Sequence, residues 1–200
     1  MIRIGTSGWS YPSWRGGFYP DGMKPAEFLG FYSERFDTVE LNSTGYRLPS
    51  EDQFRRWAEA VPDGFRFAVK LPLGRLDRVT PFLERVLALG DRLGPVRVVV
   101  EAARDDGLVS FVQGSVPGDV ELAWDFRHES WAGGGEGIVR VGDPGAEPFR
   151  YLRLREPPYS DDELAEAATG VRDPAYVYLR HEDEPTAPAY AQKLRAFVGQ

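Results

Sequence analysis

Charged side chains recur at the downstream ends of several short apolar runs, where they could build a polar site. A carboxylate beside a lysine or arginine can act as a general base, and the cation can stabilise a developing negative charge. Glu40 and Asp125 are the best candidates for such a carboxylate, and Lys70 is the cation whose pKa burial would lower. We predict these three residues as the catalytic group.

A second set of side chains is predicted to bind a substrate. Arg153 and Arg155 could clamp a carboxylate or phosphate through paired N–H donors, and Arg127, Asn42 and Tyr178 add further polar groups. An aromatic-rich stretch follows the first apolar run. Most of its rings are expected to pack as a lid over the rim, whereas Trp9 is predicted to stack on a ligand such as a sugar or a base.

The elements that must position these residues alternate between strand and helix patterns. Helical spacing lies between several of the apolar runs, which predicts βαβ units and a parallel sheet. Eight strands favour a closed TIM-like (β/α)₈ barrel over an open doubly wound sheet, in a single domain of residues 1–200. The runs are Ile2–Gly5, Thr38–Asn42, Arg66–Lys70, Val96–Glu101, Val120–Phe126, Gly137–Val141, Phe149–Arg155 and Tyr176–His181. The helical patterns are Pro25–Phe36, Phe54–Val61, Thr80–Leu93, Leu164–Ala168 and Pro188–Val198, with capping boxes at Ser50–Gln53 and Ser160–Glu163.

The barrel is expected to be incomplete. Trp131 is followed by Ala-Gly-Gly-Gly-Glu-Gly, and residues 142–148 form another loop rich in glycine and proline, so neither stretch can hold a full helix. We therefore predict that the helices after strands five and six are missing or reduced. Leu122, Trp124 and Ile138 would lose their cover, which predicts a homodimer or a rearranged loop on this side.

Side-chain alternation along the strands turns the polar candidates inward. Residues two apart share a face, so apolar neighbours such as Val39 and Leu41 point toward the helices while Glu40 and Asn42 point inside. The same parity places the charged residues of five strands at their carboxyl ends, where barrel active sites lie. The structural alternative is a paired ion network that plugs the mouth, because an unpaired buried charge costs several kcal/mol.

Composition narrows the possible partners. The formal net charge of −7 argues against nucleic acid as a partner, and the absence of cysteine excludes disulfides, thiolate metal sites and a cysteine nucleophile. His128 and His181 lack metal-ligand spacing, so we expect no metal site; His128 is interpreted as a structural hydrogen-bonding residue and His181 as part of a solvated charged loop. No motif specifies a cofactor. We also expect no signal peptide and no membrane span, and predict the cytoplasm as the location.

Several stretches carry a resemblance to a known family. They are Ile4–Gly16 with Phe18–Pro20, Val39–Thr44 with Tyr46–Pro49, Phe67–Lys70, Phe126–Trp131 and Tyr176–Leu179. Together they resemble the YecE-like family, a domain of unknown function (DUF72), and the resemblance runs from the first strand to the last. It implies a TIM-barrel-like fold and no established activity.

The strand tips depart from the usual pattern of that family. Strand four ends Val100-Glu-Ala-Ala where a Gln-Leu-Pro-Pro-like stretch is usual, and strand seven ends Arg153-Leu-Arg-Glu in place of Arg-Leu-His-Gly. Strand eight ends Arg180-His-Glu-Asp in place of an Asn-Asn-Asp-like run. These differences indicate either an altered specificity or the loss of an ancestral activity.

Three functions remain open at this point. The first is an enzyme acting on a small polar substrate, a sugar or phosphate ester, at the barrel mouth. The second is a non-catalytic binding or interaction domain, which a mouth closed by internal ion pairs would favour. The third is a nucleic-acid-processing protein. Acidic residues after strands seven and eight, such as Glu156 and Glu182, disfavour phosphate there, whereas Arg153 and Arg155 just below favour it.

Overall fold

The computed structural model describes residues 1–45, 48–74, 76–132 and 137–200. Within these ranges eight parallel strands form two sheets, with the strand orders β1-β8-β7 and β2-β3-β4-β5-β6. The strands are β1 (Ile2–Thr6), β2 (Thr38–Leu41), β3 (Arg66–Pro72), β4 (Leu93–Val100), β5 (Leu122–Phe126), β6 (Val139–Arg140), β7 (Arg150–Leu154) and β8 (Ala175–Leu179). The α/β class and the parallel pairing therefore agree with the expectation from the sequence.

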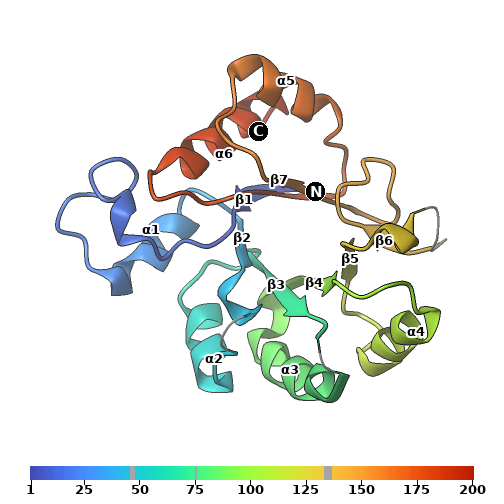
Figure 1. The fold of residues 1–200 in the computed structure, drawn as a ribbon. Coiled ribbons are helices and arrows are strands. Elements are labelled where there is room, and N and C mark those ends of the chain that lie inside the picture. Colours follow the sequence, from blue (N-terminus) through green and yellow to red (C-terminus); the bar gives the residue numbers. More distant parts are fainter. Residues whose placement is uncertain (46–47, 75, 133–136) are drawn as a thin grey trace.

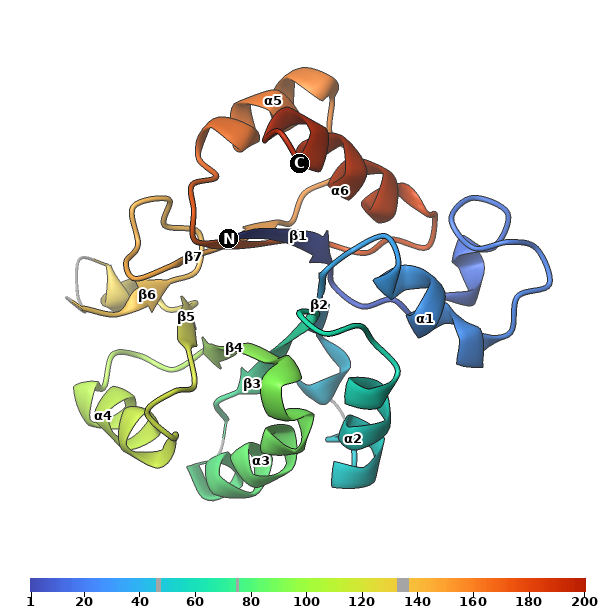
Figure 2. The same cartoon turned by 180° about the vertical axis from the view of Figure 1, so that it is seen from behind.

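Helices lie outside the strands on opposite sides (Figure 1). Helices α5 and α6 pack together, with α6 against β1 and β8, while α2, α3 and α4 lie beyond the second sheet, as the reverse view in Figure 2 also shows. The α-helices of the described residues are α1 (Phe28–Ser33), α2 (Glu51–Glu59), α3 (Val79–Val86), α4 (Asp106–Ser115), α5 (Asp161–Thr169) and α6 (Thr186–Phe197). No helix in the described ranges is both long enough and apolar enough to cross a bilayer.

Helix α4 was not expected from the sequence. Its glycines, Gly107 and Gly114, weaken the helical pattern, but the Asp105 side chain accepts hydrogen bonds from the amides of Gly107 and Leu108 and so starts the helix. Between β5 and β6 the described residues contain only the short 3₁₀ helix Glu129–Trp131, and residues 133–136 of the glycine-rich stretch lie outside the description. Between β6 and β7 the chain turns without a helix.

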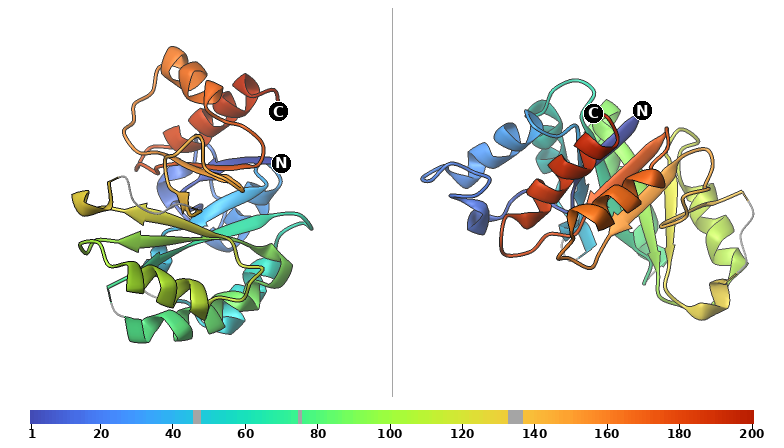
Figure 3. Two further views of the ribbon diagram at one scale, coloured as in Figure 1. Left: turned by 90° about the vertical axis from the view of Figure 1, so that its right-hand side faces the viewer. Right: turned by 90° about the horizontal axis from the view of Figure 1, so that it is seen from above.

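The two sheets do not close into one continuously hydrogen-bonded barrel, so the expectation of a closed barrel is wrong. They meet at two seams, each with an isolated parallel bridge: Ser7–Glu40 beyond β1 and Val141–Tyr151 beyond β6. Figure 3 shows the strands enclosed between α5 and α6 on one side and α3 and α4 on the other. At the second seam the reason is length, since β6 has two residues and cannot carry a longer ladder.

At the first seam a side chain takes the place of a ladder hydrogen bond. The Thr6 amide donates to the hydroxyl of Tyr32 at 2.9 Å, and that hydroxyl donates to the carbonyl of Thr38 at 3.0 Å. Tyr32 comes from α1 and is fully buried. The strands approach closely just below this point, because a Cβ on Gly5 would lie 2.2 Å from the Thr38 carbonyl oxygen. Gly5 and Tyr32 together let the two sheets meet here with one isolated bridge in place of a ladder.

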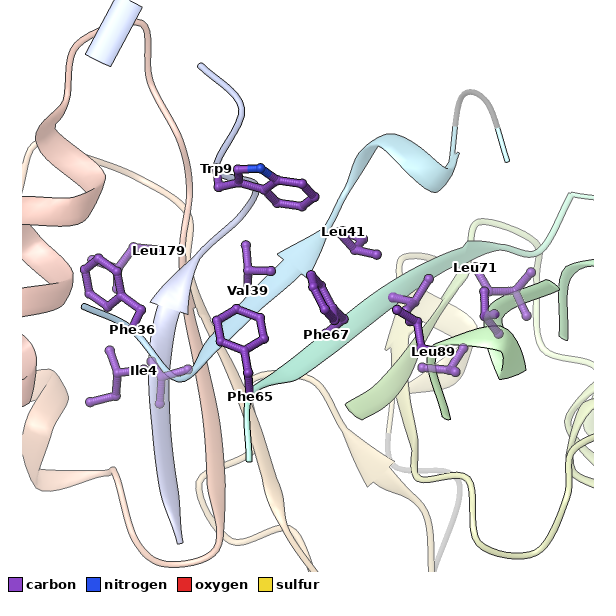
Figure 4. Packing of buried hydrophobic residues seen from close by; sticks show 14 of the residues in the cluster. Ile4, Trp9, Phe36, Val39, Leu41, Phe65, Phe67, Leu71, Leu89 and Leu179 are labelled. Carbon is purple, nitrogen blue, oxygen red and sulfur yellow. The ribbon is translucent and has the colours of Figure 1, made fainter. Parts of the chain in front are cut away.

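Strand parity separates an outer apolar layer from an inner one. Figure 4 shows the outer layer, in which Trp9 lies over Val39, Leu41 and Phe67. The inner layer is a smaller cluster of buried side chains between the two sheets. Its members are Ala68, Ala123, Val139, Ala146, Phe149, Tyr151 and Tyr178. Beyond this inner apolar layer, toward the carboxyl ends of the strands, the inward side chains are charged.

The outer face of β5 is covered within the chain. Trp124 is 1% exposed and stacks on Phe126, whose ring stacks in turn on Trp131 with centroids 4.0 Å apart. The guanidinium of Arg140 lies 4.9 Å from the Phe126 ring centre. Trp124 is therefore covered within the chain by local aromatic stacking, which agrees with the rearranged-loop alternative, while the homodimer stays a prediction.

Replacing Tyr32 with phenylalanine should destabilise the protein by about 1–3 kcal/mol, because the Thr6 amide and Thr38 carbonyl lose their buried partner. Urea unfolding followed by circular dichroism measures the change. Tyr190→Phe, on α6 and away from the seam, is the matched control. Equal stabilities for the two variants would show that the hydroxyl does not hold the sheets together.

Candidate functional site

Arg97 of β4 lies at the centre of the polar mouth, which we define as the inward side chains at the carboxyl ends of the strands. Its side chain is 1% exposed. Nε lies 2.7 Å from Glu40 Oε1, Nη1 contacts Asp125 Oδ2 at 2.5 Å, and Nη2 donates to Asn42 Oδ1 at 3.2 Å. One buried guanidinium therefore joins three of the residues predicted from the sequence.

Glu40 is fully buried and surrounded by cationic and hydroxyl groups. The Tyr151 hydroxyl donates to Glu40 Oε1 at 2.6 Å, and Arg153 Nη2 lies 2.9 Å from Oε2. Burial and the nearby charge of Glu40 raise the pKa of Tyr151 well above its ordinary value, so the hydroxyl stays protonated. Both carboxylate oxygens are thus engaged inside the protein, which leaves Glu40 poorly placed to remove a proton from a substrate.

Asp125 is the second anion of the mouth and receives three guanidiniums on one oxygen. Arg127 Nη2 and Arg155 Nη2 each donate to Oδ2 at 2.9 Å, beside the contact from Arg97. Burial alone would raise the pKa of Asp125, but the hydrogen bond from Arg155 and the charges of Arg155, Arg97 and Arg127 outweigh it and lower the pKa. Asp125 is therefore held ionised and is a weak base.

Lys70 lies on β3 near the same charges. Burial lowers its pKa, the positive charge of Arg97 lowers it further, and Glu40 opposes the shift. The Lys70 carbonyl accepts from the Thr44 hydroxyl at 2.7 Å, which ties the strand to the loop after β2. The structure thus brings Lys70 together with Glu40 and the arginines.

The arginine side chains of the mouth differ in how far they are exposed to solvent. The side chain of Arg97 is 1% exposed, that of Arg155 29% and that of Arg127 38%, while Arg153 is buried near Glu40. Among the described residues the ion pairs of this network join four arginines to two carboxylates. The paired groups therefore carry an excess of two positive charges, with Lys70 close by, in a chain whose net charge is −7.

Two predicted ligand contacts lie away from this network. Trp9 packs edge-on against Trp57 and Phe67 in the outer layer, with ring centres 5.2 and 6.2 Å away. Tyr178 is fully buried in the inner layer, where its hydroxyl lies 2.6 Å from the Thr38 hydroxyl. Tyr178 thus fills the core, whereas Trp9, 7% exposed, also lines a cavity of about 630 Å³ together with Asn42.

Sequence reasoning missed Arg97 and the environment of His181. A lone arginine in the run Val96-Arg-Val-Val-Val was the available signal, since a charge in a buried strand needs a partner. His181 stacks on Tyr11 with ring centres 4.6 Å apart, and its Nδ1 lies 3.1 Å from Ser7 Oγ. Burial, followed by the charge of Arg180, lowers the pKa of His181.

His128 forms a local hydrogen bond in the loop after β5. His128 Nδ1 lies 2.9 Å from the Ser130 hydroxyl at the start of a 3₁₀ helix, in keeping with its structural interpretation. Among the described residues no group of three histidines, aspartates or glutamates is close enough to hold a metal ion. Tyr46 and Arg47, part of one stretch behind the family resemblance, lie outside the described residues.

Comparison with known proteins decides the family. The family model described as "Protein of unknown function DUF72" matches residues 3–141. The chain belongs to the DUF72 family. The UPF0759 protein YecE of Escherichia coli strain K12 is 32% identical over 148 residues, covering 68% of this DUF72 chain and 52% of that protein. The chain thus spans about half the length of the curated relatives it matches.

Solved structures support the fold of this DUF72 protein. Two crystal structures of a DUF72 family protein from Enterococcus faecalis V583 superpose with TM-scores of 0.78 and 0.73. Their sequences are 16% and 17% identical to this one, and the alignments cover 100% of this chain and 96% and 98% of theirs. The family resemblance drawn from the sequence is confirmed, and with it the absence of an established activity.

Replacing Arg97 with methionine should destabilise this DUF72 protein by roughly 3–5 kcal/mol, because Glu40 and Asp125 lose their shared buried cation. Adding Glu40→Gln should restore part of the loss. Chemical denaturation measures both, with Arg55→Met as a control, since Arg55 forms only exposed pairs with Glu51 and Asp52. If Arg97→Met costs no more than Arg55→Met, Arg97 does not organise the mouth.

The lowered pKa of Asp125 predicts a specific dependence of stability on pH. The carboxylate stabilises the fold fully above its unfolded-state pKa of about 3.9, and this contribution disappears as the pH falls through its lower folded-state value. The difference in unfolding free energy between the native protein and Asp125→Asn should therefore be constant above about pH 5 and shrink below about pH 4. Urea titrations across this range test it, and a constant difference down to acid pH would contradict the assignment.

Proposed function

We propose that this protein binds a small anionic molecule, a phosphate ester or a carboxylate, at the carboxyl-terminal mouth of its strands. The observation that carries the proposal is the excess of two positive charges in the ion-pair network, four arginines against two carboxylates. An anion between the outer arginines would neutralise part of that excess. Binding would thus relieve repulsion that the two internal carboxylates leave uncompensated.

Arg127 and Arg155 are the proposed contact groups. Both guanidiniums are partly exposed and both are held by the same oxygen of Asp125, so they are oriented before a ligand arrives. A guanidinium has five N–H donors, and planar pairs of them match the oxygens of phosphate and carboxylate. Lys70, which lies near Arg97 and Arg127, would add a further cation on the β3 side. Asn42 stays with Arg97 as part of the support.

Glu40 and Asp125 are assigned a supporting role in this proposal rather than the catalytic one that the sequence predicted. Both oxygens of Glu40 and Oδ2 of Asp125 are engaged by arginines or by Tyr151, and a strongly paired carboxylate is a poor base. This internal pairing favours a binding domain over an enzyme that uses carboxylate chemistry. The acidic net charge speaks against nucleic acid as the ligand.

One observation favours an enzyme as a second candidate function. Lys70 has a lowered pKa and lies at the mouth, and a lysine of this kind can transfer a proton or act as a nucleophile toward a small polar substrate. In that case Lys70 would act and the arginines would position the substrate. Trp9 and Tyr178, buried in the core, are assigned no ligand contact in either version.

Three expectations from the sequence stay predictions. They are the cytoplasmic location, the reduction of the helices after β5 and β6 relative to a complete barrel, and a homodimer through the β5–β6 side. Since Trp124 is covered within the chain, such a dimer would have to rest on other side chains.

Isothermal titration with ethyl phosphate and acetate tests the proposed anion site. Arg127→Gln combined with Arg155→Gln should weaken binding by roughly tenfold or more, since charged hydrogen bonds contribute about 1.5–3 kcal/mol each. Arg172→Gln, in the exposed loop before β8 at the opposite end of the strands, should leave binding unchanged. Absence of binding, or an equal effect of the Arg172 control, would refute the proposal.

A further inference from the structure

A cleft of about 570 Å³ opens at the carboxyl ends of β7 and β8, beside the proposed anion site. Its walls carry charges of both signs. Arg155 and His181 line it from the strand ends, and the loops add the acidic residues Glu156, Glu182, Asp183 and Glu184. The sequence alone left a conflict between these acidic loops and the arginines below them, and the cleft shows that both face the same space.

The inner wall is arranged to meet an anion. Arg155 lines the cleft, and Asp125 holds its guanidinium at 2.9 Å. His181 places its Nδ1 against Ser7 Oγ, so Nε2 is the ring atom that remains to meet a ligand. These groups are cationic or can donate hydrogen bonds.

The outer wall is arranged to repel a simple anion. Its four carboxylates face one further guanidinium, that of Arg180, whose Nη1 donates to the Arg155 carbonyl at 3.4 Å. Asp183 and Glu184 are exposed, and Glu182 is held by the Thr186 hydroxyl at 2.8 Å. An anion without a compensating positive group would pass or remain beside this negative rim at an energetic cost.

We infer that the ligand of this cleft is zwitterionic, a small phosphate ester that also carries an ammonium group. Its phosphate lies inward on Arg155 and its ammonium group lies outward against the carboxylates of Asp183 and Glu184. This inference rests on the proposed function, because the phosphate end uses Arg155, one of its two contact arginines. The charge of the rim then selects among phosphate esters instead of excluding them all.

A matched pair of ligands tests the inference. 2-Aminoethyl phosphate and ethyl phosphate differ by the ammonium group, so isothermal titration of both at low salt isolates its contribution. We expect 2-aminoethyl phosphate to bind at least tenfold more tightly to the native protein. In the variant with both Asp183→Asn and Glu184→Gln the preference should fall toward unity, and ethyl phosphate should bind more tightly than it does to the native protein, because the repulsion is removed.

The outcomes separate this inference from the proposed function. Equal affinities for the two ligands, both reduced by Arg155→Gln, would overturn the zwitterion and leave the anion site standing. No binding of either ligand would overturn both. Glu59→Gln combined with Asp119→Asn, on α2 and in the loop before β5, changes the net charge equally away from the cleft and should keep the preference; its loss there would mean that overall charge, and not the rim, selects the ligand.

Discussion

The buried guanidinium of Arg97 sets the arrangement of the whole mouth. It faces Glu40, Asp125 and Asn42 from the inner side of β4, and each carboxylate then draws in further arginines. Two anions could not lie this deep without a cation between them, because the loss of hydration would cost several kcal/mol for each. The outer arginines take their positions from Asp125, so the shape of the proposed ligand site follows from one internal contact.

The fold places these residues close together because two parallel sheets meet without a continuous ladder of hydrogen bonds between them. Tyr32 links Thr6 to Thr38 at one seam, and at the same end Ser7 bridges to Glu40. At the other seam Val141 bridges to Tyr151, whose hydroxyl reaches Glu40. One seam therefore pairs with the backbone of Glu40, and the other ends on a hydroxyl that contacts its carboxylate. The stability of the sheet junctions and the geometry of the mouth are coupled through Glu40.

Much of this could be predicted from the sequence, because strand parity is a strong constraint. The alternation in Thr38–Asn42 and in the later strands correctly brings Glu40, Asn42, Asp125 and the arginines together. Whether the strands close into one hydrogen-bonded barrel could not be predicted, since this depends on Tyr32 reaching between strands from a helix. Nor could the burial of Trp9, because a ring in a loop can face either a ligand or the core. That Arg97 is paired could in principle be predicted, because it is one charge among valines. Its partners could not be predicted, because they lie on strands far away in the sequence.

We propose that the two carboxylates are held by internal pairing and that the surplus guanidiniums bind an anion. Crystals grown with selenate, an oxyanion that scatters anomalously, would test this binding. We expect an anomalous peak between the side chains of Arg127 and Arg155, with Asp125 still bonded to Arg97. A mouth without selenate while the anion occupies other basic surfaces, or Asp125 released from its arginines, would contradict it.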